Sequence, residues 1–172
     1  RRAAERRRLH GILRRIGRLA LALEGPAIVG FSQGAPLALA CAADGVVSAV
    51  AVVSGTDELA GPALRALLPA EVTQQLDLAA ADPSAVEALF RGTTPAMLVQ
   101  MVAGSPAVDL AVYREPTFAA AFSAALDEGF AQGADGFARD ALLAMQHWPF
   151  EPAQIRVPVH LWYGRLDSSP FH

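Results

Sequence analysis

A strand, a sharp turn, a helix and a second strand follow one another between residues 27 and 53, and this pattern limits the fold more than any other feature. Residues 27–31 are a short apolar run typical of a buried strand. Residues 35–43 are helical in character and end at Asp44-Gly45, and residues 46–53 form a second apolar run. Such a unit requires parallel strands with helices covering the sheet, and continuous apolar runs favour strands buried on both faces.

The remainder of the chain divides into a helical stretch and a final strand. Residues 57–150 predict helices separated by proline and glycine, with no strand, and carry large apolar side chains on alanine-rich helices. Residues 155–163 return to strand chemistry. We therefore expect an α/β protein with a sheet core in residues 1–56, a helical insertion in residues 57–150, and a core strand with its following loop in residues 151–172.

The first 18 residues hold eight arginines and one glutamate, in a chain whose net charge is −3. Leucine and isoleucine recur at helical spacing from Leu9 to Leu23, and arginines occupy the opposite face. The pattern predicts a surface helix that packs its apolar stripe onto a sheet. A nucleic-acid or membrane-surface arm and a targeting peptide are alternatives. No aromatic residues lie among the arginines, however, and the apolar stretch is too short for a signal sequence.

Composition excludes several classes of protein. Hydrophobic residues make up 53% of the chain, enough apolar surface to exclude a disordered protein. No apolar run reaches the roughly 18 residues of a membrane span, so we expect no such span and a cytoplasmic location. The single cysteine, Cys41, excludes a disulfide framework and a cysteine-based zinc site, and its position in a helix favours a buried apolar role.

The turn after the first strand has the sequence Gly30-Phe31-Ser32-Gln33-Gly34, a G-x-S-x-G motif. Small residues two positions before and after the serine let strand and helix approach closely while the hydroxyl is exposed. The N–H of Gln33, at the start of the helix, points to where an oxyanion would form. The motif predicts Ser32 as the nucleophile, Gln33 as an oxyanion-hole donor, and Gly30 and Gly34 as the elbow glycines. The alternative is a tight turn with an incidental serine.

Residues 27–43 resemble the elbow strand and following helix of α/β-hydrolase-fold enzymes. Residues 155–167 resemble the penultimate strand and acid loop of the same family, and the helical middle is similar in position to its cap domain. The resemblance implies a partial α/β-hydrolase fold, with a parallel sheet flanked by helices and an inserted all-helical cap.

The same resemblance implies a serine nucleophile at Ser32 and a triad acid at Asp167. It also implies that the early strands, with the loop that gives a second oxyanion donor, would precede residue 1. The last strand and the catalytic histidine would follow residue 172. We therefore expect an internal fragment that shows no Ser32-dependent turnover by itself.

Two aspartates are candidates for the acid. Asp167 follows a predicted parallel strand, at the edge where such sheets bind ligands, and it follows Ser32 in the chain order that this fold uses. Asp57, after the second strand, is the second choice, and its structural alternative is an N-cap for a helix beginning at Glu58.

None of the four histidines is a convincing base. His10 lies in the arginine-rich helix and His160 within a strand, so both are expected to be structural. His147 lies at the end of the insertion, and its alternative role is to line the site, but we do not expect it to be the base. His172 is five residues beyond Asp167, too close in the loop for one imidazole to bridge acid and serine.

The sequence thus predicts a serine hydrolase that acts on an ester or other acyl substrate of small apolar type through an acyl-enzyme. An acyltransferase or a haloperoxidase-like enzyme with the same triad is an alternative, as is a non-catalytic helical interaction module. We expect a small-molecule substrate, no cofactor, no metal site and no nucleic-acid partner, and the oligomeric state is open. The serine argues against epoxide hydrolases and dehalogenases of this fold, which would have aspartate at the elbow.

Overall fold

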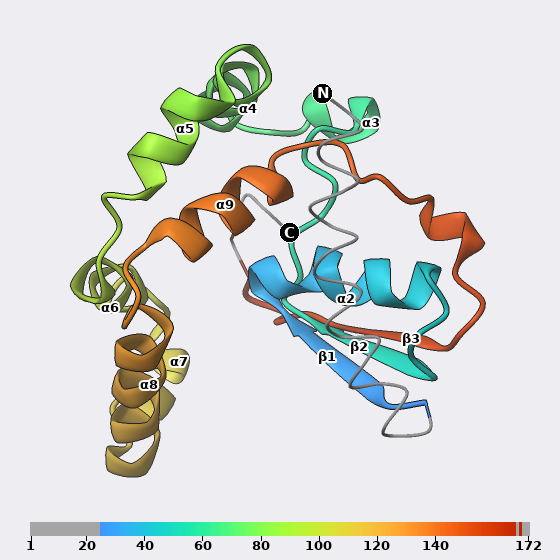
Figure 1. The fold of residues 1–172 in the computed structure, drawn as a ribbon. Coiled ribbons are helices and arrows are strands. Elements are labelled where there is room, and N and C mark those ends of the chain that lie inside the picture. The colour runs from blue at the N-terminus through green and yellow to red at the C-terminus, as the bar shows by residue number, and fades with distance from the viewer. Residues whose placement is uncertain (1–24, 168, 170–172) are drawn as a thin grey trace. The chain divides into compact units, whose positions relative to one another are not determined.

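The computed structural model describes residues 25–167 and residue 169, and every structural statement below concerns these residues. The arginine-rich segment 1–24, with His10, and residue His172 lie outside them. The described chain forms two compact units, one containing the residues up to 80 and from 143 onward, the other residues 81–142 (Figure 1). The second unit falls within the range 57–150 that the sequence predicts as an insertion. No described helix is long and apolar enough to cross a membrane.

The first unit contains a three-stranded sheet of strands β1 (Ala27–Phe31), β2 (Ala49–Val53) and β3 (Val159–Trp162), in the order β1-β2-β3 (Figure 1). Both pairings are parallel, as the strand–helix–strand pattern predicts. The protein is therefore a mixed α/β structure with a small parallel sheet flanked by helices.

Helix α2 (Ala35–Ala43) occupies the predicted residues and ends in a Schellman motif. Gly45 adopts φ 70°, its N–H donates to the Ala42 carbonyl, and the Val46 N–H donates to the Cys41 carbonyl, each at 3.1 Å. Because the Val46 N–H caps the helix, strand β2 begins at Ala49 and not at residue 46, so the predicted strand is too long at its start.

Strand β3 is also shorter than the predicted run of residues 155–163. The Pro158 carbonyl accepts a hydrogen bond from the Val50 N–H at 2.9 Å, but Pro158 has no N–H to donate to the ladder. Ladder pairing therefore starts one residue later, at Val159. Ile155 and Val157 lie before the strand and pack, partly buried, against the core.

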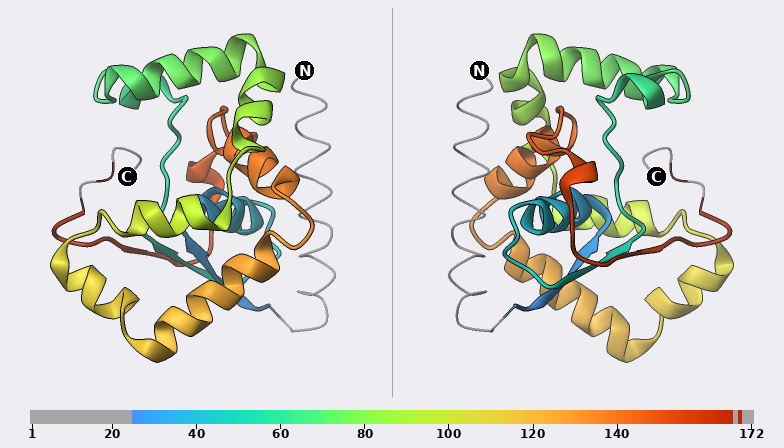
Figure 2. Two further views of the ribbon diagram at one scale, coloured as in Figure 1. Left: turned by 90° about the vertical axis from the view of Figure 1, so that its left-hand side faces the viewer. Right: turned by 90° about the vertical axis from the view of Figure 1, so that its right-hand side faces the viewer.

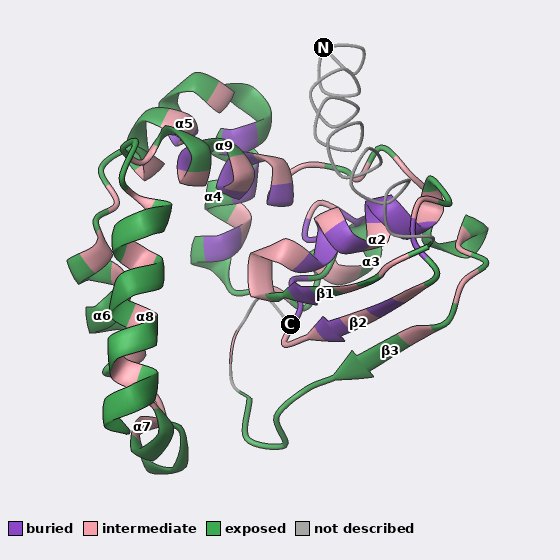
Figure 3. Cartoon of the chain, turned by 60° about the horizontal axis from the view of Figure 1, so that its bottom comes forward, coloured by how far each residue is buried: buried purple, intermediate pink, exposed green. Residues whose placement is uncertain are grey.

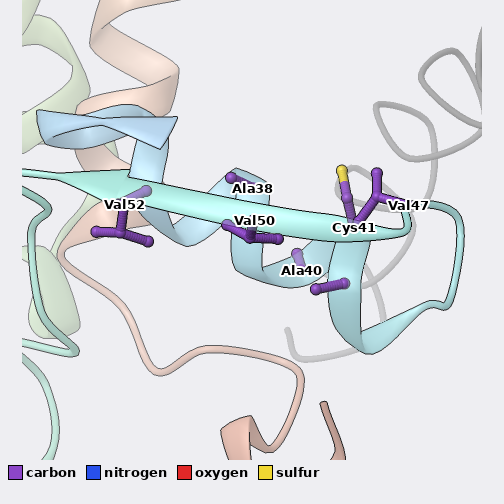
Figure 4. Close-up of a cluster of buried hydrophobic side chains, with 8 residues drawn as sticks. Ala38, Ala40, Cys41, Val47, Val50 and Val52 are labelled. Carbon is purple, nitrogen blue, oxygen red and sulfur yellow. The ribbon is translucent and has the colours of Figure 1, made fainter. Parts of the chain in front are cut away.

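The core lies between α2 and one face of the sheet (Figure 4). Val50 and Val52 of β2 are 1% and 2% exposed, and they pack with the small side chains of α2, among them Ala38 and Cys41. Burial and the nearby charge of Asp44 raise the pKa of the Cys41 thiol, which keeps it protonated. The prediction that Cys41 is buried is confirmed.

The opposite face of the sheet is exposed. Val29 and Phe31 of β1 are 66% and 62% exposed, and Trp162 of β3 is 64% exposed. Figure 3 shows that most of β3 is exposed. The prediction that the strands are buried on both faces is wrong for these residues, because α2 covers only the side on which Val50 and Val52 lie.

Two further helices follow β2 in the first unit, α3 (Pro62–Arg65) and α4 (Ala70–Ala81). An ion pair of 2.5 Å between Arg65 and Asp77 joins them. A short 3-10 turn, η2 (Pro152–Gln154), precedes the approach to β3.

The second unit is wholly helical (Figure 2). Its helices are α5 (Pro83–Phe90), α6 (Pro95–Val102), α7 (Ala107–Tyr113), α8 (Pro116–Gly129) and most of α9 (Asp135–Ala144). Residues 57–150 are all described and contain no strand, as the sequence predicts.

Three of these helices begin with a side-chain cap followed by proline. At the start of α5, the Asp82 carboxylate accepts the N–H groups of Ser84 and Ala85. At the start of α6, the Thr94 hydroxyl oxygen accepts the N–H of Met97. At the start of α8, the Glu115 carboxylate accepts the N–H groups of Thr117 and Phe118. Proline suits the first helical position because its missing N–H would be unpaired there. The proline breaks noted in the sequence are therefore helix starts.

Aromatic side chains join neighbouring helices within the second unit. Phe90 packs edge-on against Phe137 with ring centroids 6.2 Å apart, and Tyr113 contacts Phe118 and Phe122 at 5.4 Å each. Arg91, at the end of α5, pairs with Asp135 of α9 at 2.7 Å.

Asp140 of α9 supplies a test of the second unit's electrostatics. Burial raises the pKa of its carboxyl, although Arg139 acts in the opposite direction. The folded state therefore binds the proton more tightly than the unfolded chain, and stability is lost as pH rises through the folded-state pKa. We expect Asp140→Asn to raise the urea midpoint at neutral pH, with no gain near pH 3. The exposed Asp127→Asn in α8 is the control and should change neither midpoint appreciably. An Asp140→Asn protein less stable than the parent at neutral pH would contradict the assignment.

Candidate active site

The carboxyl ends of the three strands are aligned. Phe31, Val53 and Trp162 occupy corresponding positions in the ladder, so the residues that follow them, Ser32, Ser54 and Tyr163, begin three adjacent turns at one edge. Adjacent strands lie about 4.8 Å apart, which separates the ends of β1 and β3 by about 10 Å. Ligands bind at this edge in parallel α/β sheets.

Ser32 is held in a left-handed backbone conformation, with φ 48°. The 3-10 turn η1 (Ser32–Gly34) connects β1 directly to α2. A non-glycine residue in this region costs about 1–3 kcal/mol and persists only where the surrounding structure enforces it, commonly at functional sites. Its carbonyl accepts the N–H of Thr56 at 3.2 Å, and also that of Ala35. The Ser32 backbone is thus fixed, and Gln33 lies within η1, immediately before the N-cap residue of α2, Gly34.

The two glycines of the motif differ in their surroundings. A Cβ at Gly30 would lie 2.8 Å from both the Ala35 Cα and the Ala38 Cβ, so only glycine lets β1 and α2 approach this closely. A Cβ at Gly34 would meet no described atom within 4 Å. Close approach between strand and helix therefore explains Gly30 but not Gly34.

The turn after β2 also begins with a serine in a left-handed conformation, Ser54 with φ 43°. Gly55 and Thr56 are buried behind it. Asp57 is exposed, and its Oδ1 accepts the N–H of Glu58 at 2.8 Å. The structural alternative for Asp57, an N-cap for a helix beginning at Glu58, is wrong, because residues 59–60 form a turn and α3 starts only at Pro62.

The turn after β3 contains the other candidate acid. The Asp167 N–H donates to the Gly164 carbonyl at 3.1 Å, and Asp167 Oδ1 accepts the N–H of Ser169 at 3.0 Å. The Tyr163 hydroxyl donates to the Gly55 carbonyl at 3.1 Å. Burial raises the pKa of the Tyr163 phenol, and the negative charges of Asp57 and Asp167 raise it further. Both acids therefore act electrostatically on the same side chain.

The described histidines lie elsewhere. His147 Nδ1 is 3.3 Å from Glu58 Oε1, which also accepts the Trp148 N–H at 2.9 Å. This pair of contacts joins the segment that follows β2 to the segment that leads back toward β3. His160 is exposed within β3, at the position registered with Ala51, two residues before the strand end. Neither histidine is bonded to the Ser32 hydroxyl.

Neither the protein-family models nor the curated proteins and solved structures compared with this chain match it. No comparison therefore identifies an α/β-hydrolase relationship, which stays a prediction from the sequence. Among the described residues, no three His, Cys, Asp or Glu side chains gather as they would around a metal ion.

Two features of this edge were not predicted from the sequence. One is the Ser54-Gly55-Thr56 turn, whose signal is a serine-glycine pair directly after an apolar strand, as in the elbow itself. The other is the bond from Tyr163 to Gly55. Its only sequence signal is a tyrosine at the end of a strand, which is too common to identify a partner 108 residues away.

The glycine pair gives a test of the elbow's packing. Gly30→Ala should destabilise the first unit by about 1–3 kcal/mol, because the added methyl overpacks a site lined by backbone and a short side chain. Gly34→Ala, where φ is −74° and there is open space, should stay within about 0.5 kcal/mol of the parent. Urea unfolding of both variants measures the difference. Equal effects at the two glycines would contradict the close-approach explanation.

Proposed function

We propose that this chain carries the nucleophile and the acid of a serine hydrolase of the α/β-hydrolase fold, one that cleaves an ester or other acyl substrate of small apolar type. The observation that carries the proposal is the left-handed backbone of Ser32, between a strand that ends at Phe31 and a helix that begins at Ala35. A nucleophilic serine needs such a turn, since it exposes the hydroxyl at the top of the sheet beside the helix N-terminus.

In this mechanism Ser32 Oγ attacks the substrate carbonyl carbon, and its proton passes to an imidazole. The negative oxygen of the tetrahedral intermediate accepts the Gln33 N–H. The carbon–oxygen bond to the leaving group breaks, and the alcohol takes the proton from the imidazolium. Water then attacks the acyl-enzyme by the same route and releases the acid. Asp167 holds the imidazole and stabilises its charged form, and the proposal assigns the imidazole to a histidine outside the described residues.

The apolar substrate class is an expectation from the sequence, whose helical middle carries phenylalanines and methionines. On the second unit, Leu89, Met97 and Met101 are 63%, 56% and 70% exposed. An acyltransferase or a haloperoxidase-like enzyme would use the same groups with a different acceptor.

The exposed apolar side chains also favour a second candidate, a helical interaction module without catalysis. A fluorophosphonate probe separates the two functions, because it modifies only an activated serine. Labelling of the Ser32 peptide, read by mass spectrometry on the protein as its gene encodes it, supports the hydrolase. Partner binding without any labelling supports the module.

Ser32 and Ser54 form a matched pair for mutagenesis, since both are left-handed serines at the ends of adjacent strands. Ser32→Ala in the gene-encoded protein should lower the turnover of a short-chain nitrophenyl ester by on the order of 10⁶-fold, with the thermal midpoint almost unchanged. Ser54→Ala should retain most of the activity. A Ser32→Ala protein that still shows saturable turnover excludes the proposed nucleophile.

The two acids can be separated in the same assay. Asp167→Asn should lower kcat by about 10⁴-fold, because the amide cannot hold the imidazole in the required tautomer or stabilise its charge. Asp57→Asn should have a far smaller effect. If Asp57→Asn gives the larger loss, the acid follows β2 and the assignment of Asp167 is wrong.

A further inference from the structure

The turn after β2 connects the ends of all three strands through its backbone. The Ser54 N–H donates to the Trp162 carbonyl at 2.8 Å, and the Thr56 N–H donates to the Ser32 carbonyl at 3.2 Å. Between them, the Gly55 carbonyl accepts the Tyr163 hydroxyl at 3.1 Å. One short segment is therefore bonded to the elbow on one side and to the end of β3 on the other.

This segment has little freedom to move. A Cβ at Gly55 would lie 2.7 Å from the Ala35 Cβ and closer still to a methyl group of Val52. Gly55 thus packs against the first residue of α2, directly behind the elbow. Because Gly55 and Thr56 are buried, a displacement of this turn would be transmitted to Ser32.

The Tyr163 hydroxyl is the one side-chain group among these bonds. Tyr163 as a whole is 47% exposed, so it contributes less to the core than a buried aromatic residue would. Burial of the hydroxyl and the charges of Asp57 and Asp167 raise the phenol pKa, and Tyr163 therefore stays a neutral donor at physiological pH. Gly164, the next residue, begins the turn that Asp167 closes.

We propose that Tyr163 is a positioning residue: its hydroxyl fixes the start of the acid loop to the turn that holds the Ser32 carbonyl, and so sets Asp167 relative to the nucleophile. This inference rests on the proposed serine-hydrolase function. Tyr163 touches no reacting atom in this scheme and acts through Gly55 and Asp167.

The test removes one oxygen atom, with Tyr163→Phe in the gene-encoded protein. Loss of the hydroxyl bond should misplace Asp167 by a fraction of an ångström to about 1 Å, which lowers kcat by up to about 10²-fold while KM stays the same. Tyr113→Phe is the matched control, since it removes the same atom from the chain's other tyrosine, in the aromatic cluster of the second unit. It should leave kcat unchanged.

A pH profile separates positioning from a structural role. A correctly placed Asp167 stabilises the imidazolium and raises its pKa, so a misplaced one should move the acid limb of kcat/KM to lower pH. The measured rates are divided by the concentration of Ser32 sites that react with the fluorophosphonate, so that a loss of folded protein is not counted as a loss of kcat. An activity loss that only follows the number of reactive sites, with the acid limb unmoved, shows that Tyr163 merely supports the fold and overturns the inference.

Failure of this inference differs from failure of the proposed function. If Ser32→Ala is inactive while Tyr163→Phe keeps the parent kcat and pH profile, the positioning role is wrong and the hydrolase stands. If Ser32→Ala is fully active, the function itself is wrong.

A third measurement needs no activity. Ultraviolet titration of Tyr163 in the Tyr113→Phe protein should give a phenol pKa above its ordinary value of about 10, and Asp167→Asn should lower that pKa. An ordinary pKa that Asp167→Asn leaves unchanged would remove Asp167 from the neighbourhood of Tyr163.

Discussion

The close approach of β1 to α2 at Gly30 is the contact on which the rest of the site depends. Helix α2 presents alanine, cysteine and proline to the sheet, and with such short side chains the helix lies against the strand with no space for a Cβ at Gly30. The chain must then reverse from strand to helix within Ser32–Gly34. Few backbone conformations make so sharp a turn, and the left-handed φ of Ser32 is the consequence. Dense packing thus supplies the energy that keeps an unfavourable backbone conformation in place.

The same reasoning applies one strand further on, at Ser54. This serine is also left-handed, and Gly55 packs against Ala35 as closely as Gly30 does. The two turns hold each other, because the Thr56 N–H is bonded to the Ser32 carbonyl. The turns after β1 and β2 are therefore both constrained by the start of α2. Rigid turns of this kind fit the proposed function, because catalysis by preorganised groups requires a site that does not rearrange.

Local chemistry explains which parts of this arrangement could be predicted. The ends of α2, the parallel pairing of β1 with β2 and the place of Ser32 follow from signals within a few residues: proline at the helix start, glycine after its end, and apolar runs on either side. The start of β2 could not be predicted, because Val46 continues the apolar pattern while its N–H caps the helix. Exposure of Val29 and Phe31 was missed because an apolar run does not show which of its faces a helix covers. The bonds at Gly55 and Glu58 join residues 108 and 90 positions apart, and no local pattern records such pairs.

Strand spacing gives a physical reason to favour Asp167 over Asp57 as the partner of Ser32. In a Ser-His-Asp triad one imidazole lies between hydroxyl and carboxylate, so the two are separated by the width of the ring and two hydrogen bonds of about 2.8 Å each. Asp57 follows the strand adjacent to the elbow, about 4.8 Å away, which leaves a ring little room between the two ends. Asp167 follows the strand beyond it, at about twice that distance, and its turn is fixed by the bond to Gly164 and by Tyr163 at its start. In the proposed triad, an acid that follows β3 gives the imidazole the space it needs, because β2 lies between the two strand ends and its turn is bonded to both of them.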